Sequence, residues 1–181
     1  LGASDIKIHT KYVPDMSLLA TLTPEQTEAM IDRSCTRLGC EQLDLVQFHW
    51  WHYDTGNYLK ALETLKNLRD KGKVKEIGLT NFNAERVAEI VEYGIPVASL
   101  QTQYSVIDQR AKTLEPVTQQ HDIQLLCYGS VAGGLLSDAY LARAEPREPH
   151  ENRSLTKYLL MVEEMGGWEA LQEVLELLRK I

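Results

Sequence analysis

The sequence of 181 residues lacks any apolar run of about 20 residues, the length that a membrane-spanning helix needs. Its first residues, LGASDIKIHTK, have neither the charged nor the apolar segment of a signal peptide. Cysteines are few, and Cys35, Cys40 and Cys127 show no CxxC spacing, which favours reduced thiols over a disulfide framework. These absences predict an intracellular protein, cytoplasmic or organellar, with no membrane partner.

Positive charge is also scarce, because 19 Lys and Arg residues stand against 26 Asp and Glu residues, a net charge of -7. This balance argues against nucleic acid as the main partner. The sequence shows no Pro/Gly/Ser-rich linker and no low-complexity segment. We therefore predict one domain over residues 1–181, and no feature indicates its oligomeric state.

The chain does contain apolar runs that alternate with helical patterns. Strands are expected at 5–10, 43–49, 75–80, 97–103 and 123–128. Helices are expected at 24–38, 58–71, 84–93, 111–121, 154–165 and 168–181, and a polar loop at 143–153. Thr23, Asn57 and Asn83 are expected helix N-caps, and Gln26 completes a capping box with Thr23.

The order of these elements indicates an α/β fold with a parallel sheet, because each pair of strands is separated by a helix long enough to cross over. Five strands suit either a small open sheet or most of an eight-stranded (β/α)₈ TIM barrel. No strand is followed at once by GxGxxG, the chain begins inside a βα unit, and it stops in mid-helix at LELLRKI. We therefore predict a partial barrel of about five parallel strands with covering helices and a helical C-terminal tail.

In parallel α/β folds, ligands bind at the carboxyl ends of the strands. Polar and aromatic side chains gather at those predicted ends: Lys11, His49, Trp50, Trp51, Thr80, Asn81, Gln101, Tyr128, Gly129 and Ser130. Each also has an ordinary structural explanation, since strand-end lysines are usually solvated and a histidine that closes an apolar strand usually packs. A metal site is not expected, because HWWH provides two imidazoles and no third ligand is visible. The combination of residues indicates an active site more strongly than any one of them.

Five motifs together resemble the aldo-keto reductase family: IHTK, LDLVQFHWW, GKVKEIGLTNFN, SLQTQYSVIDQR and LLCYGSVAGGLLSDAYL. They follow the family's order and approximate spacing, and the match is strongest over residues 5–141. The tail LTKYLLMVEEMGGW resembles a plant- or alga-type branch. The resemblance implies a barrel that binds NADP(H), with NAD(H) not excluded, and that reduces aldehydes or ketones by hydride transfer.

The resemblance also assigns roles to residues of this sequence. Lys11 and His49 match the catalytic lysine and histidine, and Thr80, Asn81 and Gln101 match the positions that hold the nicotinamide carboxamide. Tyr128 matches the aromatic that stacks on the nicotinamide, and the pyrophosphate loop corresponds to Gly129, Ser130, Val131, Gly133 and Leu135. Trp50, Trp51 and Tyr53 suggest an aromatic wall beside a small-molecule carbonyl substrate.

In the family a tyrosine donates the proton to the carbonyl oxygen, and a nearby ammonium such as that of Lys11 lowers the high phenol pKa. A neutral His49 is expected to donate a hydrogen bond to the same oxygen. The family's tyrosine and its aspartate partner come from a segment before IHTK, so we expect this chain alone to have little or no activity. Gly129 stands where many relatives have serine.

Two alternatives stay open. One is a non-catalytic nicotinamide-binding regulatory subunit, which would keep the nicotinamide residues without efficient turnover. The other is a barrel enzyme that uses Lys11 as a Schiff-base nucleophile. The substrate and the choice of NAD or NADP are not indicated by these residues.

Overall fold

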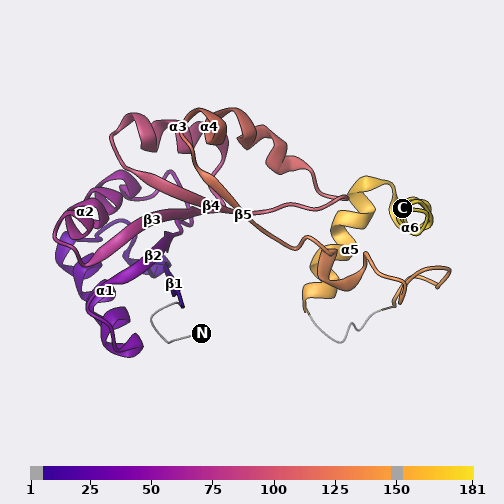
Figure 1. The fold of residues 1–181 in the computed structure, drawn as a ribbon, viewed down its shortest axis with the longest axis horizontal. Coiled ribbons are helices and arrows are strands. Elements are labelled where there is room, and N and C mark those ends of the chain that lie inside the picture. The colour runs from indigo at the N-terminus through magenta and orange to yellow at the C-terminus, as the bar shows by residue number, and fades with distance from the viewer. Residues whose placement is uncertain (1–5, 148–152) are drawn as a thin grey trace. The chain divides into compact units, whose positions relative to one another are not determined.

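The computed structural model describes residues 6–147 and 153–181 of the chain (Figure 1). The chain divides into two compact units. The first comprises Leu1–Thr102 and Thr113–Leu126, and the second comprises Gln103–Lys112 and Cys127–Ile181. The prediction of one domain over residues 1–181 stays a prediction.

The strands form one five-stranded sheet in which they lie in sequence order. They are β1 (His9–Tyr12), β2 (Leu43–Phe48), β3 (Val74–Thr80), β4 (Val97–Gln103) and β5 (Gln124–Tyr128). The pairs β1–β2, β2–β3 and β3–β4 are parallel. The predicted partial barrel with five parallel strands is therefore confirmed.

The helices of the first unit lie along one side of this sheet (Figure 1). They are η2 (Met16–Leu18), α1 (Pro24–Leu38), α2 (Tyr58–Asp70), α3 (Ala84–Glu92) and α4 (Glu115–Gln120), the last preceded by η3 (Arg110–Leu114). The capping box of Thr23 and Gln26 and the caps of Asn57 and Asn83 are confirmed. The predicted single helix at 111–121 is in fact a 3₁₀ segment followed by a short α-helix.

The first strand was expected at 5–10 and lies instead at His9–Tyr12. The expectation depended on the alternation of Ile6 and Ile8, but both side chains are exposed. Pairing with β2 begins at His9, and the buried Tyr12 ring packs against Phe48 with 5.6 Å between the ring centroids. Burial of Tyr12 therefore fixes this strand, and Asp5 lies outside the described residues.

The core of the first unit lies between the sheet and its helices. In the paired register, Tyr12, Phe48, Leu79 and Leu100 occupy equivalent positions on four adjacent strands, and all are buried. Successive side chains of a strand point to opposite faces, so this row defines the helix-covered face. On α2 the predicted inward residues Leu62, Leu65 and Leu68 are buried, whereas Leu59 is half-buried.

The second unit is mainly helical and contains η4 (Ala132–Gly134), α5 (Arg153–Met165) and α6 (Gly167–Leu178). Both predicted tail helices are confirmed, with α6 ending earlier than expected. The predicted loop at 143–153 falls partly outside the described residues. The buried core of this unit consists of Ala132, Leu135, Tyr158, Val162, Leu171 and Leu175.

Candidate active site

The opposite face of the sheet in the first unit carries polar side chains in register. Lys11 pairs with Gln47, Gln47 with Gly78, and Gly78 with Ser99. Two residues further toward the carboxyl ends, Thr80 pairs with Gln101. Paired residues project to the same face, so the predicted residues Lys11, Thr80 and Gln101 share one face and one edge of the sheet.

His49 follows β2 directly, and its backbone N–H donates to the Tyr12 carbonyl over 3.0 Å. Its ring is held by an Nδ1 contact of 3.1 Å with the Thr80 carbonyl. A carbonyl oxygen only accepts, so Nδ1 carries the hydrogen in this contact. In the neutral imidazole Nε2 then accepts a hydrogen bond, and it donates one only in the imidazolium form. The expected donation from a neutral His49 to a substrate carbonyl does not agree with this contact.

Two hydroxyls on the polar face lack a hydrogen-bond partner. Among the described residues, the buried side-chain atoms without a partner are Thr80 Oγ1 and Ser99 Oγ. Buried polar atoms are normally paired, so this face presents hydrogen-bonding capacity that a ligand can satisfy. A carboxamide offers both a donor and an acceptor, and the residues around Thr80 therefore fit a nicotinamide carboxamide.

Sequence reasoning missed Gln47 and Ser99, both of which are buried polar residues on this face. Ser99 Oγ occupies the space above Gly78, where a Cβ would lie 2.5 Å from it. The signal was present in the sequence, because polar residues recur with period two inside the apolar strands LVQFH and VASLQ.

Asn81 turns the chain immediately after β3. It has a left-handed φ of 60°, a conformation that asparagine tolerates better than most residues. Its backbone N–H donates to the Gln101 carbonyl over 2.8 Å, and its own carbonyl accepts from the Tyr53 hydroxyl over 3.5 Å. These contacts connect the ends of β3 and β4 to the loop after β2.

The predicted aromatic wall is divided between the core and the surface. Trp50 is only 2% exposed, and its Nε1 donates to the carbonyls of His52 and Thr55, so its ring belongs to the core. Trp51 is 46% exposed and packs edge-on against His49 with 4.9 Å between the centroids. Trp51 is therefore the tryptophan positioned beside the candidate catalytic histidine.

Three buried or half-buried phenols of the first unit are poorly suited to donate a proton. Burial raises the pKa of Tyr12, whose hydroxyl bonds Thr27 on the helix-covered side. Burial also raises the pKa of Tyr53. Burial and the Glu89 carboxylate raise the pKa of Tyr58 to about 12. These three phenols are all weaker acids than free tyrosine.

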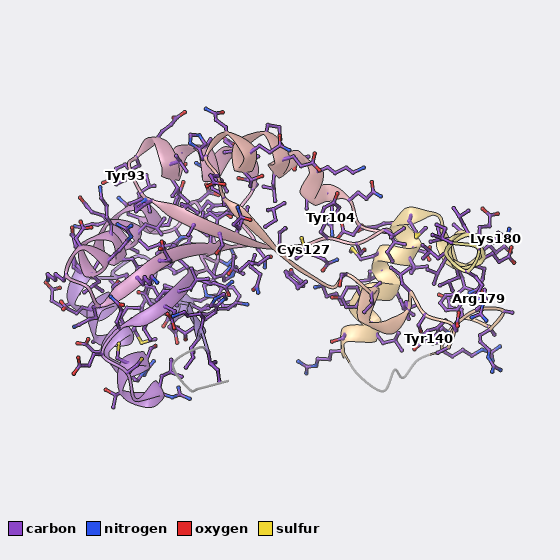
Figure 2. The ribbon with its side chains drawn as sticks, in the orientation of Figure 1. Tyr93, Tyr104, Cys127, Tyr140, Arg179 and Lys180 are labelled. Atoms are coloured by element: carbon purple, nitrogen blue, oxygen red, sulfur yellow. The ribbon has the colours of Figure 1, made fainter. Side chains whose placement is uncertain are left out.

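In the second unit, Tyr128 closes β5, and its carbonyl accepts from the Tyr104 backbone N–H over 3.1 Å. Cys127, which precedes it, is labelled in Figure 2 together with Tyr104. The Lys157 ammonium of α5 lies over the Tyr128 ring, 4.9 Å from its centroid. The predicted stacking residue is thus in contact with a cation.

The predicted pyrophosphate loop follows Tyr128 as a tight turn. Gly129 and Gly133 both have left-handed φ angles, and a Cβ on either would overlap the Tyr158 ring. Ser130 and Val131 are exposed, whereas the Leu135 side chain is fully buried in the core of this unit. Leu135 therefore offers only its backbone to a ligand.

Among residues 6–147 and 153–181, no three His, Cys, Asp or Glu side chains gather where they could hold a metal ion. Over the same residues, no helix is both long and apolar enough to cross a membrane.

The chain forms a parallel α/β sheet with polar residues in register near the carboxyl ends of its strands, where parallel α/β folds bind their ligands. The model of the Aldo/keto reductase family matches residues 3–181. The chain belongs to this family of oxidoreductases.

Individual relatives agree with this assignment. The chain is 30% identical to flagellar radial spoke protein 5 of Chlamydomonas reinhardtii over 160 residues, which cover 78% of the chain and 30% of that protein. It is 25% identical to the NADH-specific methylglyoxal reductase of Escherichia coli (strain K12) over 165 residues, 88% of the chain and 50% of that protein. The chain therefore spans half or less of the length of these relatives.

Solved structures show the same fold. The holo form of aldo-keto reductase AKR11C1 from Bacillus halodurans matches with a TM-score of 0.66 at 24% identity, over 85% of this chain and 51% of that one. A Gox0644 variant in complex with NADPH matches with the same TM-score and identity, over 75% of this chain and 49% of that one.

Proposed function

We propose that the protein containing this chain is an NADP(H)-dependent oxidoreductase that interconverts small aldehydes or ketones and their alcohols. The observation that carries the proposal is the register of Lys11, Thr80 and Gln101 on one face of the sheet, with a buried hydroxyl that lacks a partner. The NADPH complex of the Gox0644 variant supports this cofactor, and the NADH-specific E. coli relative keeps NADH as an alternative.

The cofactor, when bound, supplies the hydride. Thr80, Asn81 and Gln101 would hold its carboxamide, since their hydroxyl and amide groups offer donors and acceptors. Tyr128 would provide a flat face for the nicotinamide ring. The backbone of the loop from Gly129 to Leu135 would contact the pyrophosphate.

His49 and Lys11 would act on the carbonyl end of the substrate. With Nδ1 donating to the Thr80 carbonyl, the His49 ring has a fixed orientation, and as an imidazolium it donates from Nε2 to the carbonyl oxygen. Lys11 would hold positive charge near the group that donates the proton and would favour that group's ionised form. Trp51 would border this space.

Three phenols of the first unit are poor candidates for the proton donor of this reaction. Tyr12, Tyr53 and Tyr58 all have raised pKa values, which disfavours the proton transfer that the reaction needs. We therefore propose that the 181-residue chain binds cofactor and orients a carbonyl but turns over slowly or not at all. NADPH oxidation by this chain with 4-nitrobenzaldehyde would contradict that part of the proposal.

The sharpest test of the site is Thr80→Val, which replaces an unpaired hydroxyl with a methyl group of similar size. Removing a buried hydroxyl that has no partner should leave the free energy of unfolding unchanged or slightly raise it. If that hydroxyl binds the carboxamide, the Kd for NADPH should rise about tenfold, the loss expected for one hydrogen bond in a desolvated site.

Thr36→Val is the matched control, because the Thr36 hydroxyl bonds the Asp32 carbonyl on the exposed surface of α1. Fluorescence titration with NADPH measures both variants. An unchanged Kd in Thr80→Val would remove this residue from the cofactor site.

A non-catalytic nicotinamide-binding subunit is the second candidate. Two observations favour it: the similarity to a flagellar radial spoke protein and the weak acidity of the three phenols. NADPH binding without turnover in a longer protein that contains this chain would support it. Conversely, loss of kcat in Lys11→Met and His49→Asn variants of an active longer protein would support the reductase.

The Schiff-base alternative has weaker support. A lysine nucleophile is normally activated by desolvation or by a neighbouring cation, and Lys11 is exposed on β1. Borohydride trapping of a carbonyl compound on Lys11 tests it directly, and the absence of an adduct would exclude it.

A further inference from the structure

Lys157, on α5, lies against Tyr128, the residue predicted to stack on the nicotinamide ring. Both residues belong to the second unit. The Nζ of Lys157 lies 4.9 Å from the centroid of the Tyr128 ring and 5.1 Å from that of Tyr158. An ammonium within about 6 Å of an aromatic centroid is attracted by the negative face of the ring. Lys157 is therefore held over Tyr128 by two aromatic faces.

The helix that carries Lys157 is anchored to the loop that follows Tyr128. The neighbouring side chain, Tyr158, is 8% exposed and packs so closely on the loop that a Cβ on Gly133 would lie 2.5 Å from its Cδ2. Such tight packing leaves little freedom for α5 relative to the loop. The position of the ammonium therefore follows from the core of the unit as well as from its own side chain.

The second cation close to Tyr128 is already paired. Arg110 forms two hydrogen bonds of 2.8 Å with the Asp108 carboxylate, whose side chain is 3% exposed. The Arg110 charge is thus largely compensated by Asp108. Arg110 also interacts electrostatically with Tyr128, whereas Lys157 is the cation that lies over the face of the Tyr128 ring.

With Lys157 in place on one face, a planar ring stacks on Tyr128 only from the opposite face. A cation on one side of an aromatic ring draws its electron density and makes the other side less attractive to a second cation. The nicotinamide ring carries a positive charge when oxidised and is neutral when reduced, while the phosphates of the two cofactor forms are the same. Lys157 therefore acts differently on the two forms only through the ring.

We propose that Lys157 makes Tyr128 a platform that discriminates against the oxidised cofactor, so that the protein binds NADPH in preference to NADP⁺. The inference rests on the proposed stacking of nicotinamide on Tyr128. Two positive charges separated by one aromatic ring and partly screened by water should change the ratio of the two dissociation constants by about threefold.

The test compares NADPH, NADP⁺ and 2′-phospho-ADP-ribose, which lacks the nicotinamide, by fluorescence titration and calorimetry. In Lys157→Met, which removes the charge and keeps an apolar chain, NADP⁺ should bind about threefold more tightly, while the Kd of the other two ligands stays nearly constant. Lys157→Arg keeps a cation over the ring and should keep the wild-type ratio. Lys180→Met, at the C-terminal end shown in Figure 2, removes the same charge far along the chain and is the control.

Each outcome decides between the possible roles of Lys157. An unchanged NADP⁺ to NADPH ratio in Lys157→Met, with NADPH binding intact, would overturn the inference and leave the proposed function standing. Weaker binding of all three ligands would instead identify Lys157 as a phosphate-binding residue and also overturn it. The wild-type chain could also bind 2′-phospho-ADP-ribose but show no added affinity for either nicotinamide form. That result would contradict the proposed stacking of nicotinamide on Tyr128, and with it the role of Lys157.

Discussion

The two compact units differ in how their cores are built and in what they leave unpaired. In the first unit, rows of buried side chains run across adjacent strands, as with Phe48, Leu79 and Leu100 beneath the helices. In the second unit, the core is a smaller cluster in which Tyr158 closes against glycines. Local stability follows the amount of buried apolar contact, so we expect the first unit to be the more stable.

The polar groups show the opposite contrast. The first unit leaves the Thr80 and Ser99 hydroxyls buried without partners. The second unit satisfies its buried carboxylate, because Asp108 accepts from Arg110 and, over 2.7 Å, from Gln103. The unit with the stronger core therefore contains the unfilled hydrogen-bonding capacity, which agrees with a ligand site supported by a rigid sheet.

Phe48→Ala should produce the largest effect, because it removes a fully buried ring that packs on Tyr12, Trp50 and Phe82. A buried Phe→Ala change costs about 4 kcal/mol. Hydrogen exchange should speed up across β1 to β3, while α5 and α6 keep their protection. The conservative Phe48→Leu should cost about 1 kcal/mol, the scale of a tolerated apolar exchange. Equal loss of protection in both units would show that they unfold as one.

Gly133→Ala should be next in size and should affect the second unit. The φ of 64° disfavours a side chain, and the new Cβ would lie 2.5 Å from Tyr158 Cδ2. Strain and overpacking together should cost about 3 kcal/mol. Gly134 has a φ of 99° but nothing within 4 Å of its Cβ position, so Gly134→Ala is a matched control. It should cost about 1 kcal/mol, from backbone strain alone.

Thermal unfolding followed by the fluorescence of Trp168, in a Trp50→Phe/Trp51→Phe background, measures this pair of variants. If the two substitutions cost the same, contact of Gly133 with Tyr158 contributes nothing to the stability of the second unit. That result would mean that the core of this unit is stabilised mainly by its aliphatic residues, Leu135, Val162, Leu171 and Leu175.

The sequence was sufficient for the features that depend on local chemistry. Thr23, Asn57 and Asn83 cap their helices as predicted, because capping needs only neighbouring backbone N–H groups. The parallel order of strands followed from alternation of elements. The shared edge of Lys11, Thr80 and Gln101 then followed from the period of two along each strand.

The features that sequence reasoning missed depend on contacts between distant residues. The start of β1 is set by packing of Tyr12 on Phe48, which the alternation of Ile6 and Ile8 does not reveal. Trp50 and Trp51 are adjacent and equally apolar, yet one lies in the core and the other at the surface. The contact between Lys157 and Tyr128 joins residues that lie far apart in the sequence, and no local pattern predicts it.

At acid pH, the two units should lose different amounts of stability, an effect smaller than those of the two core substitutions. Hydrogen bonds from Arg110 lower the pKa of Asp108, and hydrogen bonds from Tyr58 and Arg86 lower that of Glu89. A carboxyl whose pKa is lowered by folding stabilises the protein above its unfolded pKa of about 4 and loses that stabilisation as the pH falls. Asp108 is the more buried of the two, so the second unit should lose more stability than the first as the pH falls, by about 2 kcal/mol.

Trp168 fluorescence in a Trp50→Phe/Trp51→Phe background can follow this acid transition, with hydrogen exchange as the check on the first unit. Asp108→Asn should flatten the acid dependence, since an amide does not titrate. A larger acid-induced loss of protection in β2 and β3 than in α5 and α6 would contradict this expectation.

The smallest predicted effect is a loss of stability of the first unit at alkaline pH. Burial and the Glu89 carboxylate raise the pKa of Tyr58 from 10.0 to about 12. The folded state then keeps a proton that the unfolded state loses, so stability falls as the pH rises from about 10 through about 12, by about 1 kcal/mol at pH 11. Tyr58→Phe should lower this dependence by that amount and leave the part due to the raised pKa values of Tyr12 and Tyr53. Tyr93→Phe, at an exposed position after α3 (Figure 2), should leave the dependence unchanged. Urea unfolding at pH 8 and pH 11 measures the difference, and a pH dependence as large in Tyr58→Phe as in the wild type would show that another group holds the proton.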